Sequence, residues 1–254
     1  MPHIDRDGVL IYYEERGKGP AVLMTHGYGA TLRMWDRQME ALAHFYRMIA
    51  WDMRGHGQTD SPEDPAAYSH EATIADMTAV LHACGVERAV IAGLSLGGFM
   101  SLAFHLAHRD RVSALMLFDT GPGYKKERSR EQWNRYAEET ARTFESKGIE
   151  AVGTSAEVAV AEHRSAQGLA HAARGMLTQK DARVIESLPH IEVPTLVLAG
   201  SNDKPFLAST DYMAATIPHA RKVIIDGAGH APNVEKPEAF NDAVASFLRD
   251  LRSD

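Results

Sequence analysis

Short apolar runs alternate with amphipathic stretches over most of this chain. The apolar runs predict strands over residues 9–14, 21–25, 46–51, 112–118, 195–199 and 222–225, and one more strand leads from Val90 toward Ser95. Between the runs, apolar residues at helical spacing predict helices over about 32–42, 71–84, 205–217 and 237–251, and another begins after Ser95. This alternation predicts an α/β fold, in which helices cover both faces of a mostly parallel sheet.

The alternation stops after residues 119–123, where only helical patterns follow as far as about residue 188. One amphipathic stripe carries Trp133, Tyr136, Ala137, Thr140 and Phe144. Further helices are predicted over 151–162 and 166–177, with a short one over 180–188. We interpret this segment as a lid over the strand ends. The predicted division is therefore a core domain, residues 1–120 and 189–254, and an inserted all-helical cap, residues 121–188.

Composition and charge narrow the classes of function. A length of 254 residues suits one large α/β domain with an insertion, and a net charge of −7 without a long basic run argues against a nucleic-acid partner. The single cysteine, Cys84, cannot form an internal disulfide, which suits a reducing compartment. Neither a signal peptide nor a membrane span is recognisable. We expect a cytoplasmic monomer or homodimer with no membrane partner.

The strongest chemical signal is the pentapeptide Gly93-Leu94-Ser95-Leu96-Gly97, between a predicted strand and a predicted helix. A sharp strand-to-helix turn would expose the hydroxyl of Ser95 above the sheet, and the flanking glycines would avoid collisions at that turn. The amide of Leu96 would lie at the helix start, where negative charge is stabilised. The pattern therefore predicts a nucleophilic serine with half of an oxyanion hole.

A nucleophilic serine needs a base, and the base needs an acid that orients it. His230 lies in a glycine-rich loop after the last predicted strand, and we interpret it as the base in preference to His26 and His56. Asp203 follows a buried strand and is the preferred acid, although capping a helix would also explain an aspartate there. Asp119 ends another strand and remains a rival acid.

The loop after the early strand predicts further binding groups. The backbone amide of Tyr28 is expected to complete the oxyanion hole. A largely apolar pocket is expected, and its predicted lining residues are Tyr28, Trp35, Leu96, Phe99, Tyr124, Trp133, Tyr136, Phe206 and Pro232. Arg54, in Asp52-Met53-Arg54-Gly55-His56-Gly57, is interpreted as stabilising its turn together with Asp52. No cluster has convincing metal-ligand spacing, so neither a metal nor a cofactor is expected.

Together these residues resemble the α/β-hydrolase superfamily. The matching pieces are His26-Gly27-Tyr28-Gly29, the turn around Arg54, the Ser95 pentapeptide, Gly200-Ser201-Asn202-Asp203 and Gly229-His230. The resemblance covers nearly the whole chain and implies an eight-stranded, mostly parallel sheet with a small cap after the sixth strand. Serine at position 95 argues against the dehalogenase and epoxide hydrolase branches, which use aspartate there.

The resemblance implies a small single-cap serine hydrolase, similar to carboxylesterases, enol-lactonases and meta-cleavage-product hydrolases. We therefore expect cleavage of a small-molecule carboxylic ester or lactone through an acyl-enzyme on Ser95. Two alternatives stay open. One is a hydrolase of carbon–carbon bonds that uses the same three residues. The other is a ligand receptor on the same fold, which would show near-stoichiometric rather than repeated cleavage.

Overall fold

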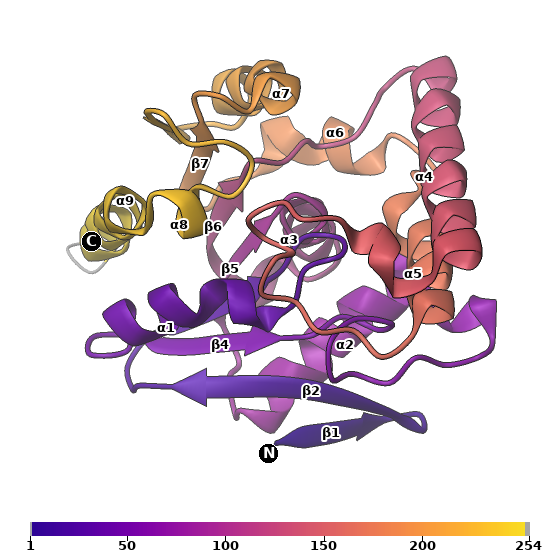
Figure 1. The fold of residues 1–254 in the computed structure, drawn as a ribbon. Coiled ribbons are helices and arrows are strands. Elements are labelled where there is room, and N and C mark those ends of the chain that lie inside the picture. Colours follow the sequence, from indigo (N-terminus) through magenta and orange to yellow (C-terminus); the bar gives the residue numbers. More distant parts are fainter. Residues whose placement is uncertain (1, 252–254) are drawn as a thin grey trace.

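A single eight-stranded sheet organises the computed structural model, which describes residues 2–251 (Figure 1). Its strands are β1 (His3–Arg6), β2 (Val9–Arg16), β3 (Ala21–Thr25), β4 (Arg47–Trp51), β5 (Ala89–Leu94), β6 (Val112–Phe118), β7 (Thr195–Gly200) and β8 (Arg221–Ile225). Their order across the sheet is β1-β2-β4-β3-β5-β6-β7-β8. β1 and β2 run antiparallel to their neighbours, and β4 to β8 with β3 are parallel. The α/β prediction with an eight-stranded, mostly parallel sheet is confirmed.

The central strands are buried on both faces because helices cover each face. Every residue of β3, β5 and β7 is buried, and alternate side chains enter separate cores, as the twofold repeat of a strand requires. On β3, Leu23 faces one core, while Val22 and Met24 face the other. β8 lies at an edge and carries exposed Arg221 and Lys222, charges that discourage pairing with another chain.

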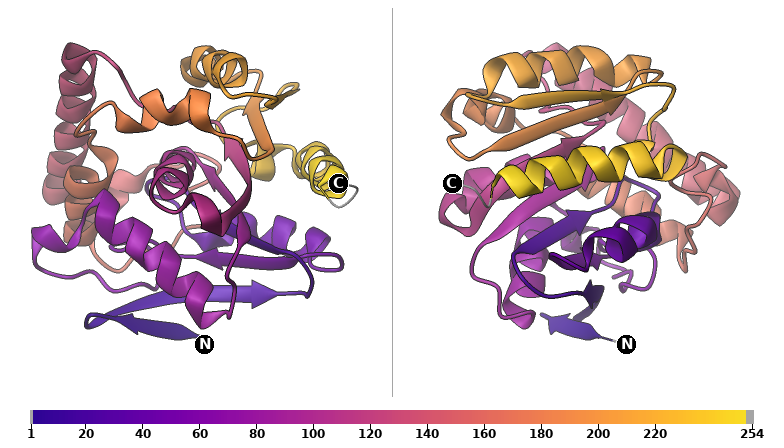
Figure 2. Two further views of the ribbon diagram at one scale, coloured as in Figure 1. Left: turned by 180° about the vertical axis from the view of Figure 1, so that it is seen from behind. Right: turned by 90° about the vertical axis from the view of Figure 1, so that its left-hand side faces the viewer.

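Helices pack on the two faces in distinct groups. One core contains apolar residues of α2 (His70–Ala83), α3 (Leu96–Ala107) and α7 (Lys204–Thr216). The other contains residues of α1 (Asp36–Leu42) and α9 (Pro237–Asp250), which lie together in the right-hand view of Figure 2. Short helices α6 (Arg183–Ser187) and α8 (Pro232–Glu235) complete the framework. Within the described residues, no helix is both long and apolar enough to cross a membrane.

The connection between β6 and β7, residues 119–194, contains helices joined by loops and turns, with no strand in that range. α4 (Glu127–Lys147) packs against α5 (Ala166–Ala172), and a π turn (Ala173–Leu177) extends α5. In Figure 1 these elements stand beyond the sheet on the side toward which the arrow of β4 points. The insertion therefore lies at the carboxyl ends of the parallel strands, where α/β sheets bind ligands.

The predicted helix over residues 151–162 is wrong. A 3-10 turn (Gly148–Val152) ends at Gly153, whose φ of 82° is incompatible with a helix. A single turn follows, in which the amides of Val158 and Ala159 bond to the carbonyl of Ser155. Val158 is buried, and its side chain packs over Gly29. This long-range contact outweighs the local helical pattern. β1 was also not predicted, since its four residues carry no apolar run.

Arg54 and Asp52, which the sequence predicts to stabilise the same turn, have different partners. The guanidinium of Arg54 donates to both carboxylate oxygens of Asp76 on α2, at 2.7 and 3.0 Å, and Arg6 of β1 donates to the same carboxylate. Asp52 instead accepts the amides of Leu32 (2.7 Å) and Gln58 (2.9 Å). The side chains of Arg54 and Asp76 are 5% and 0% exposed, so each charge depends on its partner for compensation.

Asp76→Ala is expected to lower the free energy of unfolding by about 3–5 kcal/mol, because it leaves the buried Arg54 charge unpaired. Urea unfolding of the purified variant measures this change. The matched control is Asp211→Ala, which removes an ion pair with Lys222 between side chains that are 65% and 45% exposed. That variant should change by less than about 1 kcal/mol. Equal shifts in the two variants would contradict the buried-pair interpretation.

Candidate active site

Ser95 occupies a strained turn between β5 and α3. Its φ is 55° and its ψ is −116°, a conformation that a non-glycine residue adopts only when its surroundings enforce it. The turn packs too closely for side chains at Gly93 and Gly97: a Cβ on Gly97 would lie 2.2 Å from the carbonyl oxygen of Thr25. Ser95 itself is half-buried. The local geometry is therefore that of the predicted strand–turn–helix, with the serine at its apex.

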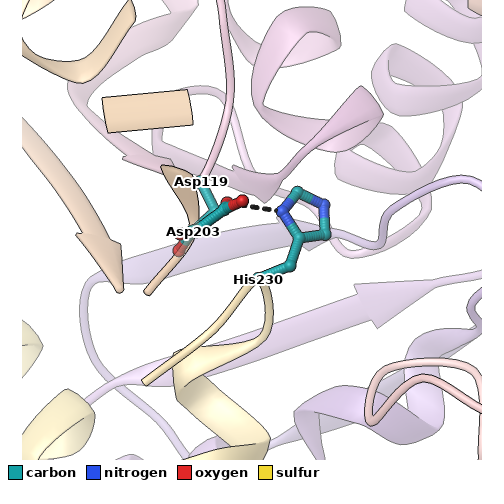
Figure 3. A group of neighbouring side chains, drawn as sticks. All are labelled: Asp119, Asp203 and His230. Carbon is teal, nitrogen blue, oxygen red and sulfur yellow. Dashed lines mark hydrogen bonds and ion pairs between the residues drawn. The ribbon is translucent and has the colours of Figure 1, made fainter. Parts of the chain in front are cut away.

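Asp203 and His230 meet in a direct hydrogen bond (Figure 3). Asp203 follows β7 and precedes α7, and His230 lies in the loop after β8. Nδ1 of His230 is 2.7 Å from Oδ2 of Asp203. The aspartate side chain is only 6% exposed, whereas that of His230 is 28% exposed. With Nδ1 engaged by the buried acid, Nε2 is the ring nitrogen left for proton exchange at the surface of the site.

Asp119, the rival acid, lies in the same cluster. It follows β6 with a φ of 41°, and Oδ1 accepts the amide of Gly200 at 2.9 Å. Burial and the neighbouring Asp203 raise the pKa of Asp119 to about 9. Ligand atoms of Asp119, Asp203 and His230 lie within 4.8 Å of one another, a spacing that could also suit a cation. The direct bond between His230 and Asp203 already uses two of those atoms.

The loop that contains Tyr28 lies beside Ser95. A Cβ on Gly27 would be 3.4 Å from Cβ of Ser95, and within the described residues no backbone hydrogen bond uses the amide of Tyr28. Leu96 is the first residue of α3, so its amide has no acceptor within the helix. The phenol of Tyr28 donates to the carbonyl of Leu169 at 2.8 Å. Two backbone donors therefore flank Ser95, and the Tyr28 ring is tied to the inserted segment.

Three histidines hold the Tyr28 loop in place, and only two of them, His26 and His56, were considered from the sequence. His26 donates from Nδ1 to the carbonyl of Gly27 (2.7 Å), and its Nε2 accepts the amide of Met53 (3.0 Å). His56 accepts the amide of Gly29 (3.2 Å). His163, from the inserted segment, donates to the carbonyl of Gly29 (2.8 Å) and accepts the amide of Gly57 (3.2 Å). No local pattern marks His163, because its partners lie more than 100 residues away.

All three rings are neutral, because each accepts a backbone N–H. Burial lowers the pKa of His26 to about 3 and lowers those of His56 and His163. When unfolded, these histidines take up protons below about pH 6.5, whereas the folded ones stay neutral. Each therefore contributes stability near pH 7 that is lost as the pH falls, by up to about 1.4 kcal/mol per pH unit.

His163→Gln is expected to make the unfolding free energy less steeply dependent on pH, by up to about 1.4 kcal/mol per unit below pH 6.5. Urea unfolding of both proteins at pH 7.5, 6.5 and 5.5 measures the two slopes. Burial raises the pKa of Asp52 to about 6, which makes its effect on the pH dependence of stability opposite to that of the histidines. Subtracting one slope from the other cancels this effect, because both proteins contain Asp52. Identical slopes would show that His163 is protonated equally in the folded and unfolded states.

The predicted pocket residues lie in several different places. The ring of Phe206 stands 4.9 Å from that of His230. Tyr124 lines a cavity of about 410 Å³ with residues of α7, and Phe99 lines a separate one of about 230 Å³ beside α2. Pro232 is buried at the start of α8, and Trp133 donates to the carbonyl of Leu177.

One of the pocket predictions is wrong. Trp35 is fully buried in the core beneath α9, in ring contact with Phe118 and Phe240, so it leaves no surface for a substrate. Aromatic residues favour apolar surroundings, which does not distinguish a pocket from a core. Tyr136, on α4, is 54% exposed and contacts Trp133, and its place in a pocket stays a prediction.

Comparison with known proteins gives consistent matches over the whole chain. The model of the alpha/beta hydrolase family matches residues 22–243. A Bacillus subtilis protein with the provisional name 2-succinyl-6-hydroxy-2,4-cyclohexadiene-1-carboxylate synthase is 28% identical, over 96% of this chain and 97% of its own. The 3-oxoadipate enol-lactonase 1 of Acinetobacter baylyi is 29% identical, over 98% and 96%. A thermophilic esterase from Thermogutta terrifontis superposes with a TM-score of 0.82 at 29% identity, covering 99% of both chains.

Proposed function

Since the chain belongs to the alpha/beta hydrolase family and is an enzyme, we propose that it is a serine hydrolase of a small carboxylic ester or lactone. The observation that carries the proposal is that the three predicted catalytic residues all follow the carboxyl ends of parallel strands, on the same side of the sheet. The strained Ser95 turn ends β5, and the bonded Asp203–His230 pair follows β7 and β8. Relatives named as an esterase and an enol-lactonase support the same class of substrate.

The proposed reaction proceeds in two halves. In the first, Ser95 attacks the ester carbonyl while Nε2 of His230 accepts the serine proton, and His230 then returns a proton to the departing alcohol. In the second, His230 takes a proton from water as the water attacks the acyl-enzyme. His230 then returns that proton to the oxygen of Ser95 as the acid leaves. A lactone gives one product, because its alcohol and acid stay connected. Asp203 keeps Nδ1 protonated and stabilises the charged imidazolium of each half-reaction.

The negative oxygen of each tetrahedral intermediate would lie between the amides of Tyr28 and Leu96. Both amides are fixed before substrate arrives, one by the histidine-held loop and one by the start of α3. Such donors act on charge that develops in the transition state, and removing one typically costs about 3 kcal/mol of its stabilisation. Phe206 beside His230 contributes an apolar wall, which favours a largely apolar substrate group.

Residues 121–188 are proposed to form the cap over this site. Two of the contacts above already join them to the Tyr28 loop, one through His163 and one through Leu169. The cap would exclude bulk water from the oxyanion hole, which strengthens hydrogen bonds to the developing charge. Because it lies at the carboxyl ends of the strands, the cap would limit the size of the substrates that enter the site.

Steady-state hydrolysis of p-nitrophenyl esters of increasing acyl length, together with a lactone, tests the proposal. We expect multiple turnovers with an optimum acyl length, and stoichiometric inactivation by a fluorophosphonate that labels Ser95. The labelled residue is identified by peptide mass spectrometry. One slow turnover per chain would favour the receptor alternative. Rapid labelling of Ser95 without ester or lactone turnover would favour a carbon–carbon substrate. Turnover that survives complete labelling would refute the assignment of Ser95.

A further inference from the structure

Asp119 is a buried acid to which the proposed mechanism gives no task. It is fully buried, and its side chain turns from the end of β6 toward the end of β7, where Oδ1 accepts the amide of Gly200. No N–H or hydroxyl group of the described residues reaches Oδ2, which is also buried. The carboxyl groups of Asp119 and Asp203 lie beside each other (Figure 3), with an oxygen of one within 4.8 Å of an oxygen of the other.

The side chain of Asp203 has little else to orient it. Although Asp203 stands at the N-terminal cap position of α7, its side chain accepts no hydrogen bond from that helix. Within the described residues, the hydrogen bond of its carboxyl group is the one to His230. A carboxylate held at one oxygen alone could rotate about its last torsion, which is broad for aspartate. A hydrogen bond from the neighbouring carboxyl of Asp119 would limit that rotation.

Two neighbouring buried carboxyl groups favour holding one proton, because two negative charges at such a short distance repel strongly. The proton belongs on Asp119. This residue has one oxygen paired with an amide, one oxygen without any other donor, and no exposed surface. Asp203, by contrast, faces the Nδ1–H of His230, which stabilises its negative charge. The hydrogen bond therefore runs from the hydroxyl of Asp119 to the carboxylate of Asp203.

We propose that Asp119 is a neutral hydrogen-bond donor that positions the carboxylate of Asp203 against His230. It is a positioning residue rather than a catalytic one, since it acts through Asp203. The proposal rests on the proposed serine hydrolase function for its kinetic consequences, although the hydrogen bond itself does not. It also assigns different tasks to the two acids that the sequence left as rivals: Asp203 is the ionised partner of His230, and Asp119 is the protonated support behind it.

The charged and titratable groups around Asp119 come from every element at this edge of the sheet. Asp203 lies at the start of α7, Glu235 lies on α8, and His230 lies in the loop after β8. Burial and both acids raise the pKa of Asp119, to about 9. Above that pH the proton is lost, the donor disappears and the two carboxylates repel. The proposal therefore predicts a decline of kcat/KM above about pH 9 in the wild-type enzyme.

The test compares Asp119→Ala, Asp119→Asn and Asp203→Asn on p-nitrophenyl acetate. Alanine removes the donor, and kcat/KM should fall about 100-fold, mostly through kcat, because Asp203 is misplaced. Asparagine keeps a neutral donor of the same shape and should restore kcat/KM to within about threefold of wild type. It should also abolish the decline above pH 9, because an amide does not titrate. Asp203→Asn should lose about 10⁴-fold in kcat.

Two outcomes would overturn the proposal. If Asp119→Asn loses as much activity as Asp203→Asn, Asp119 is ionised and shares the acid role. If Asp119→Asn keeps the decline of the wild-type enzyme above pH 9, Asp119 is not the group that titrates. Because both outcomes use the asparagine variant, the test survives even if Asp119→Ala fails to fold, which circular dichroism reveals.

A proton NMR measurement separates this proposal from the proposed function. The Nδ1 proton of His230, bonded to Asp203, should give a low-field signal that Asp119→Asn preserves and Asp119→Ala shifts or removes. This readout needs no substrate. Loss of the signal in Asp119→Asn would overturn the positioning role, whereas turnover that persists in Ser95→Ala would refute the hydrolase mechanism and leave the Asp119 contact intact.

Discussion

Ser95→Ala is expected to lower kcat for ester hydrolysis by about a million-fold, the size of loss seen when a serine hydrolase loses its nucleophile. The turn at Ser95 has no other nucleophilic side chain, because leucines flank the serine on both sides and glycines lie beyond them. Substrate binding should be little affected, since the proposed oxyanion amides of Tyr28 and Leu96 belong to the backbone. Rates come from steady-state assays on protein freshly purified from an esterase-deficient host.

Ser101→Ala is the matched control. This serine lies on α3, the helix that begins just after Ser95, and its hydroxyl donates to the carbonyl of Gly97 at 2.8 Å. Its variant should retain turnover and fluorophosphonate labelling, whereas Ser95→Ala should lose both. If Ser95→Ala kept a tenth of the wild-type rate, the strained turn would need another explanation, and the proposed reaction would be wrong.

Asp203→Asn is expected to lower kcat by about 10⁴-fold with little change in KM. The amide is nearly isosteric with the carboxylate, so the fold should persist. It removes the negative charge that stabilises the imidazolium, and it can hold the ring with the wrong nitrogen protonated. The loss should therefore appear as lost transition-state stabilisation rather than as weaker substrate binding.

Asp226→Asn is the control for Asp203. It lies in the same loop as His230, but its carboxylate contacts the hydroxyl of Ser201, at 3.4 Å, on the solvent-exposed side. This variant should keep its activity. Equal losses in Asp203→Asn and Asp226→Asn would mean that the loop, rather than one acid, determines the rate. A small loss in Asp203→Asn alone would make Asp119 the partner of His230.

Local patterns were sufficient for the framework of the fold. The apolar runs over 21–25 and 112–118 coincide with β3 and β6, since a strand buried on both faces must be apolar along its whole length. The glycines around Ser95 were also sufficient to predict the turn there, because a sharp turn between strand and helix excludes side chains. In both cases the physical cause lies within a few residues of the sequence that shows it.

Contacts between distant residues could not be predicted in this way. Residues 151–162 form a turn because Val158 packs over Gly29, and Arg54 pairs with Asp76 on another element. Trp35 is of a residue type that is common in pockets, but it lies in the core. Each outcome depends on which surfaces meet after folding, and helical spacing or residue type alone carries no information about that.

The sequence by itself determined the α/β framework, the position of the Ser95 turn and the order in which Asp119, Asp203 and His230 follow their strands. Only the tertiary structure decided which of the two acids, Asp119 or Asp203, forms the hydrogen bond with His230. Both end buried strands, so both fit the same sequence pattern. Asp203 bonds to His230, whereas Asp119 accepts the amide of Gly200. Both hydrogen bonds join chain segments that meet only when the sheet assembles.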